Sequence, residues 1–218
     1  MTAKTRIKIC GVRDLETARC AARAGAQYVG LVFATNSPRQ VTTRQACAIV
    51  EGLDETTEAV VLFADQPLQF VRHVLDELPV NLVQLHGHEN RAYIEALDDK
   101  TIFKAVPFDQ NRIKPWRRAP HHVGALLIDS PTSPGEPTGG HGRAFDWPGL
   151  SYLDRVDLPP LILAGGLTPD NVGAAVQTVQ PWGVDVSSGV EASRGVKDLR
   201  LIREFCKAVR QADTNDGE

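Results

Sequence analysis

Short apolar runs alternate with segments of helical periodicity along almost the whole chain. Apolar runs bounded in this way are typical of β-strands. Eight of them predict strands, at residues 7–10, 28–33, 59–63, 81–85, 102–106, 124–128, 161–164 and 183–186.

The segments between these strands carry apolar residues at the spacing of one helix face. The clearest sets are Leu15, Ala18 and Ala22, then Ala46, Ile49, Val50 and Leu53, then Leu68, Val71, Leu75 and Leu78. Further helices are predicted over 91–97, 169–179 and 197–209. Thr168 is an N-cap candidate and Pro169 suits a first helical position, so a helix is expected to start there. Residues 109–120 are weakly patterned and stay ambiguous.

Strict alternation of strands and helices favours a parallel sheet of the α/β class. Eight units in 218 residues favour closure into a βα (TIM) barrel over an open doubly wound sheet. The length suits a single domain, which we expect to span residues 1–210 as the catalytic domain. Residues 211–218 are polar and acidic, so we expect a flexible, dispensable C-terminal tail. The Pro/Gly-rich segment 130–143 is longer than ordinary βα loops and is interpreted as a lid.

Composition and charge exclude several classes of partner. The formal net charge is -3, so nothing attracts the chain generally to nucleic acid or to an anionic membrane, and an anionic ligand must be held locally. The four cysteines form no Cys-x-x-Cys, which argues against a disulfide framework or a zinc ribbon. The N-terminus resembles no signal peptide and no apolar run reaches membrane length. We therefore expect a cytoplasmic protein.

Active sites of βα barrels lie at the C-terminal ends of the strands, which makes polar residues there the first candidates. This criterion selects Cys10, Arg39, His86, Asp129 and Asp185. His86 and His88 stand at one strand end without a convincing third ligand elsewhere, so no metal is expected. The glycines of 139–142 lack the strand and helix context of a dinucleotide-binding motif.

Two segments rich in small residues suit a phosphate group. Gly165-Gly166 follows the seventh predicted strand and Ser187-Ser188-Gly189 follows the eighth, where backbone N–H groups can face an anion. Either segment alone could equally be a tight turn. Together, after strands seven and eight, they favour phosphate binding.

Asp129 and Cys10 are candidates for acid and base chemistry. Asp129 follows an apolar strand, where desolvation would raise its pKa and leave a carboxyl able to donate a proton. It could equally order the loop before Ser130-Pro131. Cys10 could act as a base only if its pKa is lowered, and it could instead be a small buried hydrophobic residue. Arg39 could hold a carboxylate in a bidentate fork or be a solvated charge.

Five motifs, in chain order, resemble those of the phosphoribosylanthranilate isomerase family. They are Lys8-Ile9-Cys10-Gly11, Ser37-Pro38-Arg39, Gln84-Leu85-His86-Gly87, Gly165-Gly166-Leu167-Thr168-Pro169 and Val184-Asp185-Val186-Ser187-Ser188-Gly189-Val190-Glu191. Asp129, Gly139-Gly140-x-Gly142 and Phe145-Asp146-Trp147 join them, so the resemblance spans nearly the whole chain. His141 and His88 depart from the family's usual Thr and Asp, which puts only loop contacts in question.

The resemblance implies an Amadori rearrangement in tryptophan biosynthesis. N-(5-phosphoribosyl)anthranilate, an aminoaldose, becomes 1-(2-carboxyphenylamino)-1-deoxyribulose 5-phosphate, an aminoketose, without a cofactor. The family's motifs imply that Asp129 is the general acid and Cys10 the general base, which requires a raised carboxyl pKa and a lowered thiol pKa.

The resemblance also implies which residues hold the substrate. Arg39 would hold the anthranilate carboxylate or stabilise charge near the imine, while His86 and Asp185 would contact or orient the substrate. The phosphate would lie on Gly165, Gly166, Ser187, Ser188 and Gly189.

Three alternatives to this function stay open at the level of the sequence. The barrel could be another phosphosugar isomerase or epimerase, because fold and phosphate site do not fix chemistry. It could also accept the analogous aminoaldose of histidine biosynthesis, although that relative normally has an acidic residue where this chain has Cys10. A non-catalytic phosphosugar-binding sensor is the third. The sequence leaves open whether the protein is a monomer or a homodimer.

Overall fold

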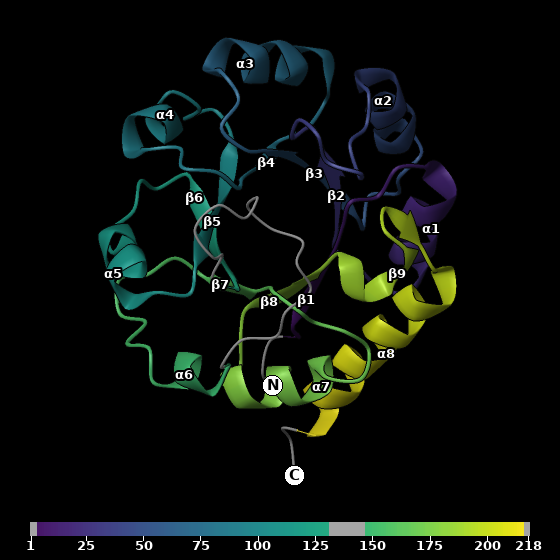
Figure 1. Ribbon diagram of the computed structural model, residues 1–218, viewed down its shortest axis with the longest axis vertical. Helices are drawn as coiled ribbons and strands as arrows, with labels where there is room; N and C mark the ends of the chain where they lie inside the picture. The colour runs from purple at the N-terminus through teal and green to yellow at the C-terminus, as the bar shows by residue number, and fades with distance from the viewer. Residues whose placement is uncertain (1–3, 131–146, 216–218) are drawn as a thin grey trace.

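The computed structural model describes residues 4–130 and 147–215. Eight parallel strands form a closed barrel in chain order, and β8 pairs with β1 to complete it (Figure 1). The strands are β1 (Arg6–Cys10), β2 (Tyr28–Val32), β3 (Glu58–Phe63), β4 (Leu82–Leu85), β5 (Thr101–Pro107), β6 (Val123–Asp129), β7 (Leu161–Leu163) and β8 (Gly183–Val186). The predicted α/β barrel is confirmed.

Helices surround the barrel on its outside (Figure 1). They are α1 (Leu15–Arg23), α2 (Thr43–Glu51), α3 (Leu68–Glu77), α4 (Arg91–Glu95), α5 (Gln110–Ile113), α6 (Pro148–Ser151), α7 (Val172–Val179) and α8 (Leu199–Asn215). Two short 3-10 helices, η1 (Lys114–Trp116) and η2 (Ser188–Val190), and a small hairpin of β9 (Glu191–Ser193) and β10 (Val196–Lys197) complete the described elements. The ambiguous residues 109–120 thus hold α5 and η1.

Local sequence explains where several helices begin. The Asp14 carboxylate accepts a hydrogen bond from the Thr17 N–H at 2.8 Å and caps α1. Thr42 and Gln45 form a reciprocal capping box at the start of α2.

The predicted start of the seventh helix is wrong. α7 begins at Val172, not Pro169, although the Val172 N–H already donates to the Thr168 carbonyl at 3.0 Å. The Asn171 side chain bonds the Thr168 N–H and the Gly166 carbonyl, at 2.8 and 2.9 Å. These bonds shape the preceding residues as a turn, and the Thr168 side chain is not the cap.

The last helix extends past the boundary expected from the sequence. Residues 211–215 continue α8, with Ala212 buried. The Asp213 carboxylate accepts bonds from the Thr5 N–H at 3.2 Å and from Arg210 at 3.0 Å. These contacts hold the helix end against the residue that precedes β1, whereas a flexible tail was expected there. Residues 131–146, which contain most of the expected lid, and residues 216–218 lie outside the described residues.

Side chains of the strands alternate between two apolar layers. One layer, including Val29, Val61 and Val83, packs between barrel and helices. The other fills the barrel interior with Tyr28, Val60, Leu82, Phe103, Leu127 and Ile162. Trp182 packs against this inner layer, and the Arg6 guanidinium lies 4.4 Å from its ring centroid. The interior is therefore packed with apolar side chains below its polar inner residues, Lys8, Gln84 and Asp185. Within the described residues, no helix is both long and apolar enough to cross a membrane.

Candidate active site

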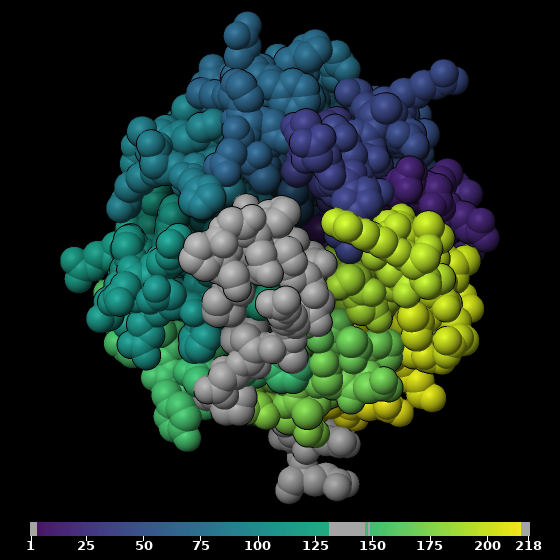
Figure 2. Space-filling view, in the orientation of Figure 1, coloured from purple at the N-terminus to yellow at the C-terminus, as the bar shows by residue number. Residues whose placement is uncertain are grey.

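A cavity of about 510 Å³ lies at the C-terminal ends of the strands. This volume suits a small-molecule ligand. Seen from this side, the segment of β9 and β10 meets the segment that follows β2 at the rim (Figure 2), and a Cβ on Gly195 would lie 2.7 Å from the Pro38 carbonyl oxygen. The predicted site residues that line the cavity are Cys10, Arg39, His86, Asp129, Gly165, Gly166, Asp185, Ser187 and Ser188.

Cys10, Lys8 and Asp185 form a charged group on the inner face of neighbouring strands. Lys8 and Cys10 are two residues apart on β1 and so share the face that points into the barrel. Lys8, fully buried, donates to the Asp185 carboxylate at 2.8 Å, and the two residues are register partners between β1 and β8. A Cβ on Gly30 would lie 2.8 Å from Cys10 Sγ and 3.1 Å from Lys8 Nζ, so these two atoms are close neighbours.

The thiol of Cys10 is held mainly in its protonated form. Burial raises its pKa, and the positive charges of Lys8 and Lys197 oppose that rise without cancelling it. The pKa of Lys8 is raised, because Asp185 and Cys10 outweigh the effect of burial. The expected lowering of the Cys10 pKa is therefore wrong for this arrangement, since desolvation of the thiolate exceeds its attraction to the lysines.

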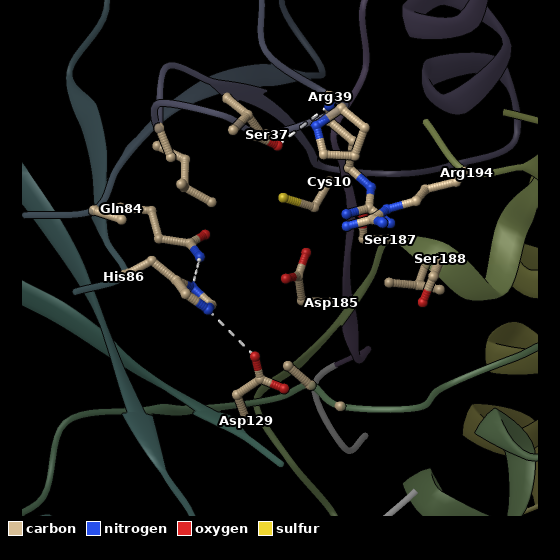
Figure 3. Close-up of a pocket in the computed structure, with 18 of the residues that line it drawn as sticks. Cys10, Ser37, Arg39, Gln84, His86, Asp129, Asp185, Ser187, Ser188 and Arg194 are labelled. Atoms are coloured by element: carbon tan, nitrogen blue, oxygen red, sulfur yellow. Dashed lines mark hydrogen bonds and ion pairs between the residues drawn. The ribbon is translucent and has the colours of Figure 1, made fainter. Parts of the chain in front are cut away.

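Asp129 lies at the end of a hydrogen-bonded chain across the ends of β4 and β6 (Figure 3). His86 Nε2 is 3.3 Å from Asp129 Oδ2, and the Gln84 amide nitrogen is 2.8 Å from His86 Nδ1. The Ser130 N–H donates to Asp129 Oδ1 at 2.7 Å. Burial acts to raise the pKa of Asp129, but the bonds from His86 and Ser130 outweigh it and lower the pKa. The expected rise is wrong because these donors stabilise the carboxylate.

Arg39 is held by a carboxylate of the protein itself. Its Nε and Nη2 donate to the two Glu191 oxygens at 2.7 and 3.0 Å, a bidentate pair. Lys197 donates to Glu191 at 2.9 Å and to the Ser187 carbonyl at 2.8 Å. Burial raises the pKa of Glu191, but Arg39, Lys197 and the Gly195 N–H lower it to about 2. Glu191 therefore stays ionised and fixes the guanidinium at the cavity wall.

The two glycine- and serine-rich segments pack against each other, and Gly165 lies beside Asp129. Gly165 and Gly166 both have positive φ, and a Cβ on Gly165 would lie 2.6 Å from the Ser130 nitrogen, so no other residue fits easily. Gly189 differs from the expectation, since it is not part of the cavity lining. A Cβ there would collide with the Leu167 carbonyl oxygen, so its lack of a side chain lets η2 pack against the loop after β7.

Several residues in the cavity lining or next to it were not singled out from the sequence. Gln84 and Lys8 stand two positions before His86 and Cys10, so period-two alternation could have placed them on the same inner faces. Glu191 lies in a recognised motif, but its partner Arg39 is distant in sequence. Arg194 lines the cavity from the turn between β9 and β10, and a lone exposed arginine gives no sequence signal.

His88 does not join His86 in the cavity. Its Nδ1 lies 3.0 Å from an Asp65 carboxylate oxygen at an exposed position. Among residues 4–130 and 147–215, no group of three or more His, Cys, Asp or Glu side chains could hold a metal ion.

Comparisons with known proteins agree on one family. A family model described as N-(5′-phosphoribosyl)anthranilate (PRA) isomerase matches residues 7–208. The N-(5′-phosphoribosyl)anthranilate isomerase of Pseudomonas aeruginosa is 44% identical over 212 residues, covering 94% of this chain and 95% of that relative.

Two solved structures are similar over nearly their whole length. Phosphoribosyl anthranilate isomerase in complex with reduced 1-(o-carboxyphenylamino)-1-deoxyribulose 5-phosphate has a TM-score of 0.81 and 32% identity, covering 95% of this chain and 99% of that one. Monomers generated from the dimeric Thermotoga maritima phosphoribosylanthranilate isomerase have a TM-score of 0.79 and 32% identity, with the same coverage.

Proposed function

The chain belongs to the N-(5′-phosphoribosyl)anthranilate isomerase family and acts as that isomerase in tryptophan biosynthesis; we propose that Asp129 is its general acid and Cys10 its general base. One observation carries the assignment of roles. Cys10 from the end of β1 and Asp129 from the end of β6 line the same cavity, with Arg39 and the segments after β7 and β8 on its remaining walls.

The reaction needs one proton delivered and one removed. Asp129 gives its proton to the furanose ring oxygen. The bond between C1 and that oxygen breaks, the oxygen stays on C4 as a hydroxyl, and the nitrogen lone pair forms a C1–N iminium. The Cys10 thiolate then takes the proton from C2, and the C–H electrons form a C1–C2 double bond as the iminium is neutralised. The resulting enol converts to the ketone of the product. Acid and base thus act on two atoms that are both bonded to C1 of one bound sugar.

The protonation states of the two groups define the active form. The directions of the two pKa values favour a protonated thiol and an ionised carboxylate. Moving one proton from Cys10 to Asp129 gives the reactive form without changing the total number of protons. The reactive form is therefore the minor arrangement of a singly protonated pair, and its population falls tenfold for each unit by which the two pKa values separate.

The remaining residues hold the substrate at its two anionic ends. Glu191 takes the Nε edge of Arg39, so the anthranilate carboxylate binds the opposite edge of that guanidinium. The phosphate lies on the backbone of Gly165, Gly166, Ser187 and Ser188, next to the start of η2. His86 and Asp185 flank the sugar between these two ends.

The oligomeric state and the cellular location of the protein are also proposed. A dimeric relative exists in Thermotoga maritima, and we propose a monomer or a homodimer for this chain. We further propose a cytoplasmic enzyme whose ligand is a phosphorylated small molecule, with a single catalytic domain that includes α8 to its end at Asn215.

Turnover of freshly generated phosphoribosylanthranilate, followed by loss of its fluorescence, tests the roles of both residues. We expect activity in the wild type and its loss in Cys10→Ser and Asp129→Asn, with folding of each variant checked by circular dichroism. Both variants should still bind the reduced product analogue. Retention of wild-type turnover by either variant would remove that residue from the mechanism.

A further inference from the structure

Gln84 is a buried polar residue for which the mechanism above has no use. It lies on β4, is fully buried, and lines the cavity between the apolar interior and His86. Burying an amide without partners for both its ends is costly, so a buried glutamine with one free end requires an explanation.

The orientation of the Gln84 amide is fixed by its neighbour. Its nitrogen has hydrogens and no acceptor capacity, so His86 Nδ1, 2.8 Å away, accepts the bond. The neutral ring then carries its hydrogen on Nε2, which faces Asp129. The amide oxygen consequently points away from His86, toward the middle of the cavity (Figure 3).

That oxygen, Oε1, has no hydrogen-bond partner within the described part of the chain. It is an acceptor only, so the missing partner must be a donor. Phosphate and carboxylate oxygens are themselves acceptors at neutral pH and cannot supply this bond. The donors that an aminosugar phosphate offers are its sugar hydroxyls and its anilino N–H.

We propose that Gln84 is a substrate-binding residue whose Oε1 accepts a hydrogen bond from a sugar hydroxyl of the substrate. This inference rests on the proposed function only for the identity of the ligand. The hydroxyl is favoured over the anilino N–H because Gln84 stands beside His86 and Asp129, where the sugar is attacked, whereas the anthranilate end is held at Arg39. Arg39 and Glu191 form their ion pair between the segment that follows β2 and the first residue of β9, while Gln84 belongs to β4.

The bond would also connect substrate binding to the acid. A hydroxyl that donates to Oε1 polarises the amide and strengthens its donation to His86, which in turn donates to Asp129. The other ionisable groups around the cavity are Cys10, Arg39, Asp65, Asp185 and Arg194. Among the described residues that line the cavity, Gln84 and Asp129 are the two whose side chains contact the ring nitrogens of His86.

Isothermal titration of the reduced product analogue, and of versions that each lack one sugar hydroxyl, tests the proposal. In the wild type, loss of one particular hydroxyl should weaken binding about tenfold, as expected when a buried acceptor loses its partner. In Gln84→Met, which has similar length and no amide, loss of that same hydroxyl should weaken binding less than twofold. Equal losses in both proteins for every hydroxyl would overturn the proposal.

Two further titrations distinguish the sugar hydroxyl from the anilino N–H and from a general effect of removing a buried amide. An analogue with an ether oxygen in place of the anilino nitrogen should lose the same amount of affinity in the wild type and in Gln84→Met. If this analogue alone lost more affinity in the wild type than in Gln84→Met, the hydroxyl assignment would be contradicted. Gln66→Met is the matched control, because Gln66 is also buried but has partners at both ends, the Ala64 N–H and the Phe33 carbonyl. Its hydroxyl dependence should equal that of the wild type.

The outcome is distinguishable from failure of the catalytic assignment. Binding of the analogue does not require turnover, so the dependence of its affinity on Gln84 can be measured whether or not Cys10 and Asp129 prove to be the base and the acid. Should Gln84→Met not fold, Gln84→Glu keeps an acceptor at the same place and should keep the wild-type discrimination among the analogues. Loss of that discrimination in a folded Gln84→Glu would count against the proposal.

Discussion

Lys8 should set how much of Cys10 is thiolate. Its ammonium group is fully buried next to the thiol and is paired with Asp185 at 2.8 Å. Replacing Lys8 by Met removes a positive charge near Cys10 and leaves the negative charge of Asp185, and both changes disfavour the thiolate. An opposite charge within about 4–6 Å lowers a pKa by roughly 1–3 units. Because Asp185 neutralises part of the lysine's field, we expect the lower end, a rise of about one unit.

The kinetic consequence has a specific form. If the reactive pair is Cys10 thiolate with protonated Asp129, a higher thiol pKa makes that arrangement rarer, so kcat/KM at neutral pH falls about tenfold in Lys8→Met. At the same time the alkaline limb of the pH profile moves upward by about one unit, because it reports loss of the last proton from the pair. A fall in activity without this upward movement would refute the reasoning.

Peptide-resolved mass spectrometry of iodoacetamide alkylation against pH measures the thiol directly. The midpoint for Cys10 should rise in Lys8→Met and fall in Asp185→Asn, which removes the opposing negative charge. Cys206 is an internal control, since burial raises its pKa to about 12 and it should stay unreactive in every variant. An unchanged Cys10 midpoint in a folded Lys8→Met would show that the lysine does not govern the thiol.

Stability provides the check on folding. Lys8→Met leaves the Asp185 carboxylate, 8% exposed, without its cation, which should lower the free energy of unfolding by about 3–5 kcal/mol. The double variant Lys8→Met/Asp185→Asn removes both charges and should recover most of that loss in urea unfolding.

Three more measurements follow from the structure. Glu191 has a pKa lowered to about 2, so it stabilises the fold at pH above its ordinary pKa of 4.5 and loses that contribution as pH falls toward 2. Glu191→Gln should therefore flatten the pH dependence of the free energy of unfolding, measured with urea, between these two pH values. An equally steep dependence in the variant would contradict this. Gly189→Ala should weaken binding of the product analogue and lower the free energy of unfolding, because the added Cβ meets the Leu167 carbonyl. Gly173→Ala in α7 is the control: its added Cβ lies 3.8 Å from the nearest atom, and it should raise the free energy of unfolding by up to about 1 kcal/mol. Similar effects of the two substitutions would contradict this. Phe103→Ala in the inner apolar layer, 2% exposed, should lower the free energy of unfolding by about 3–5 kcal/mol in thermal or urea melts while leaving KM near its wild-type value.

The barrel itself could be predicted from the sequence because its determinants are local. Apolar runs such as residues 59–63 can only be strands when helical patterns lie on both sides, and eight such units leave little choice of architecture. The structure differs from the prediction mainly at helix ends. α7 begins at Val172 because the Asn171 side chain holds the preceding residues in a turn, and α8 continues to Asn215 because Asp213 bonds Thr5. Such contacts depend on neighbours that periodicity does not show.

The position of the site residues could also be predicted, because strand ends of a barrel converge on one face. Their ionisation could not. The sequence suggested a raised pKa for Asp129 and a lowered one for Cys10, and the structure has the opposite directions. These directions depend on which donors and charges reach each group across the barrel: His86 from β4 for the carboxyl, and burial against Lys8 for the thiol. A sequence determines which groups exist and on which face they lie, whereas only tertiary structure sets the distances and desolvation on which a pKa depends.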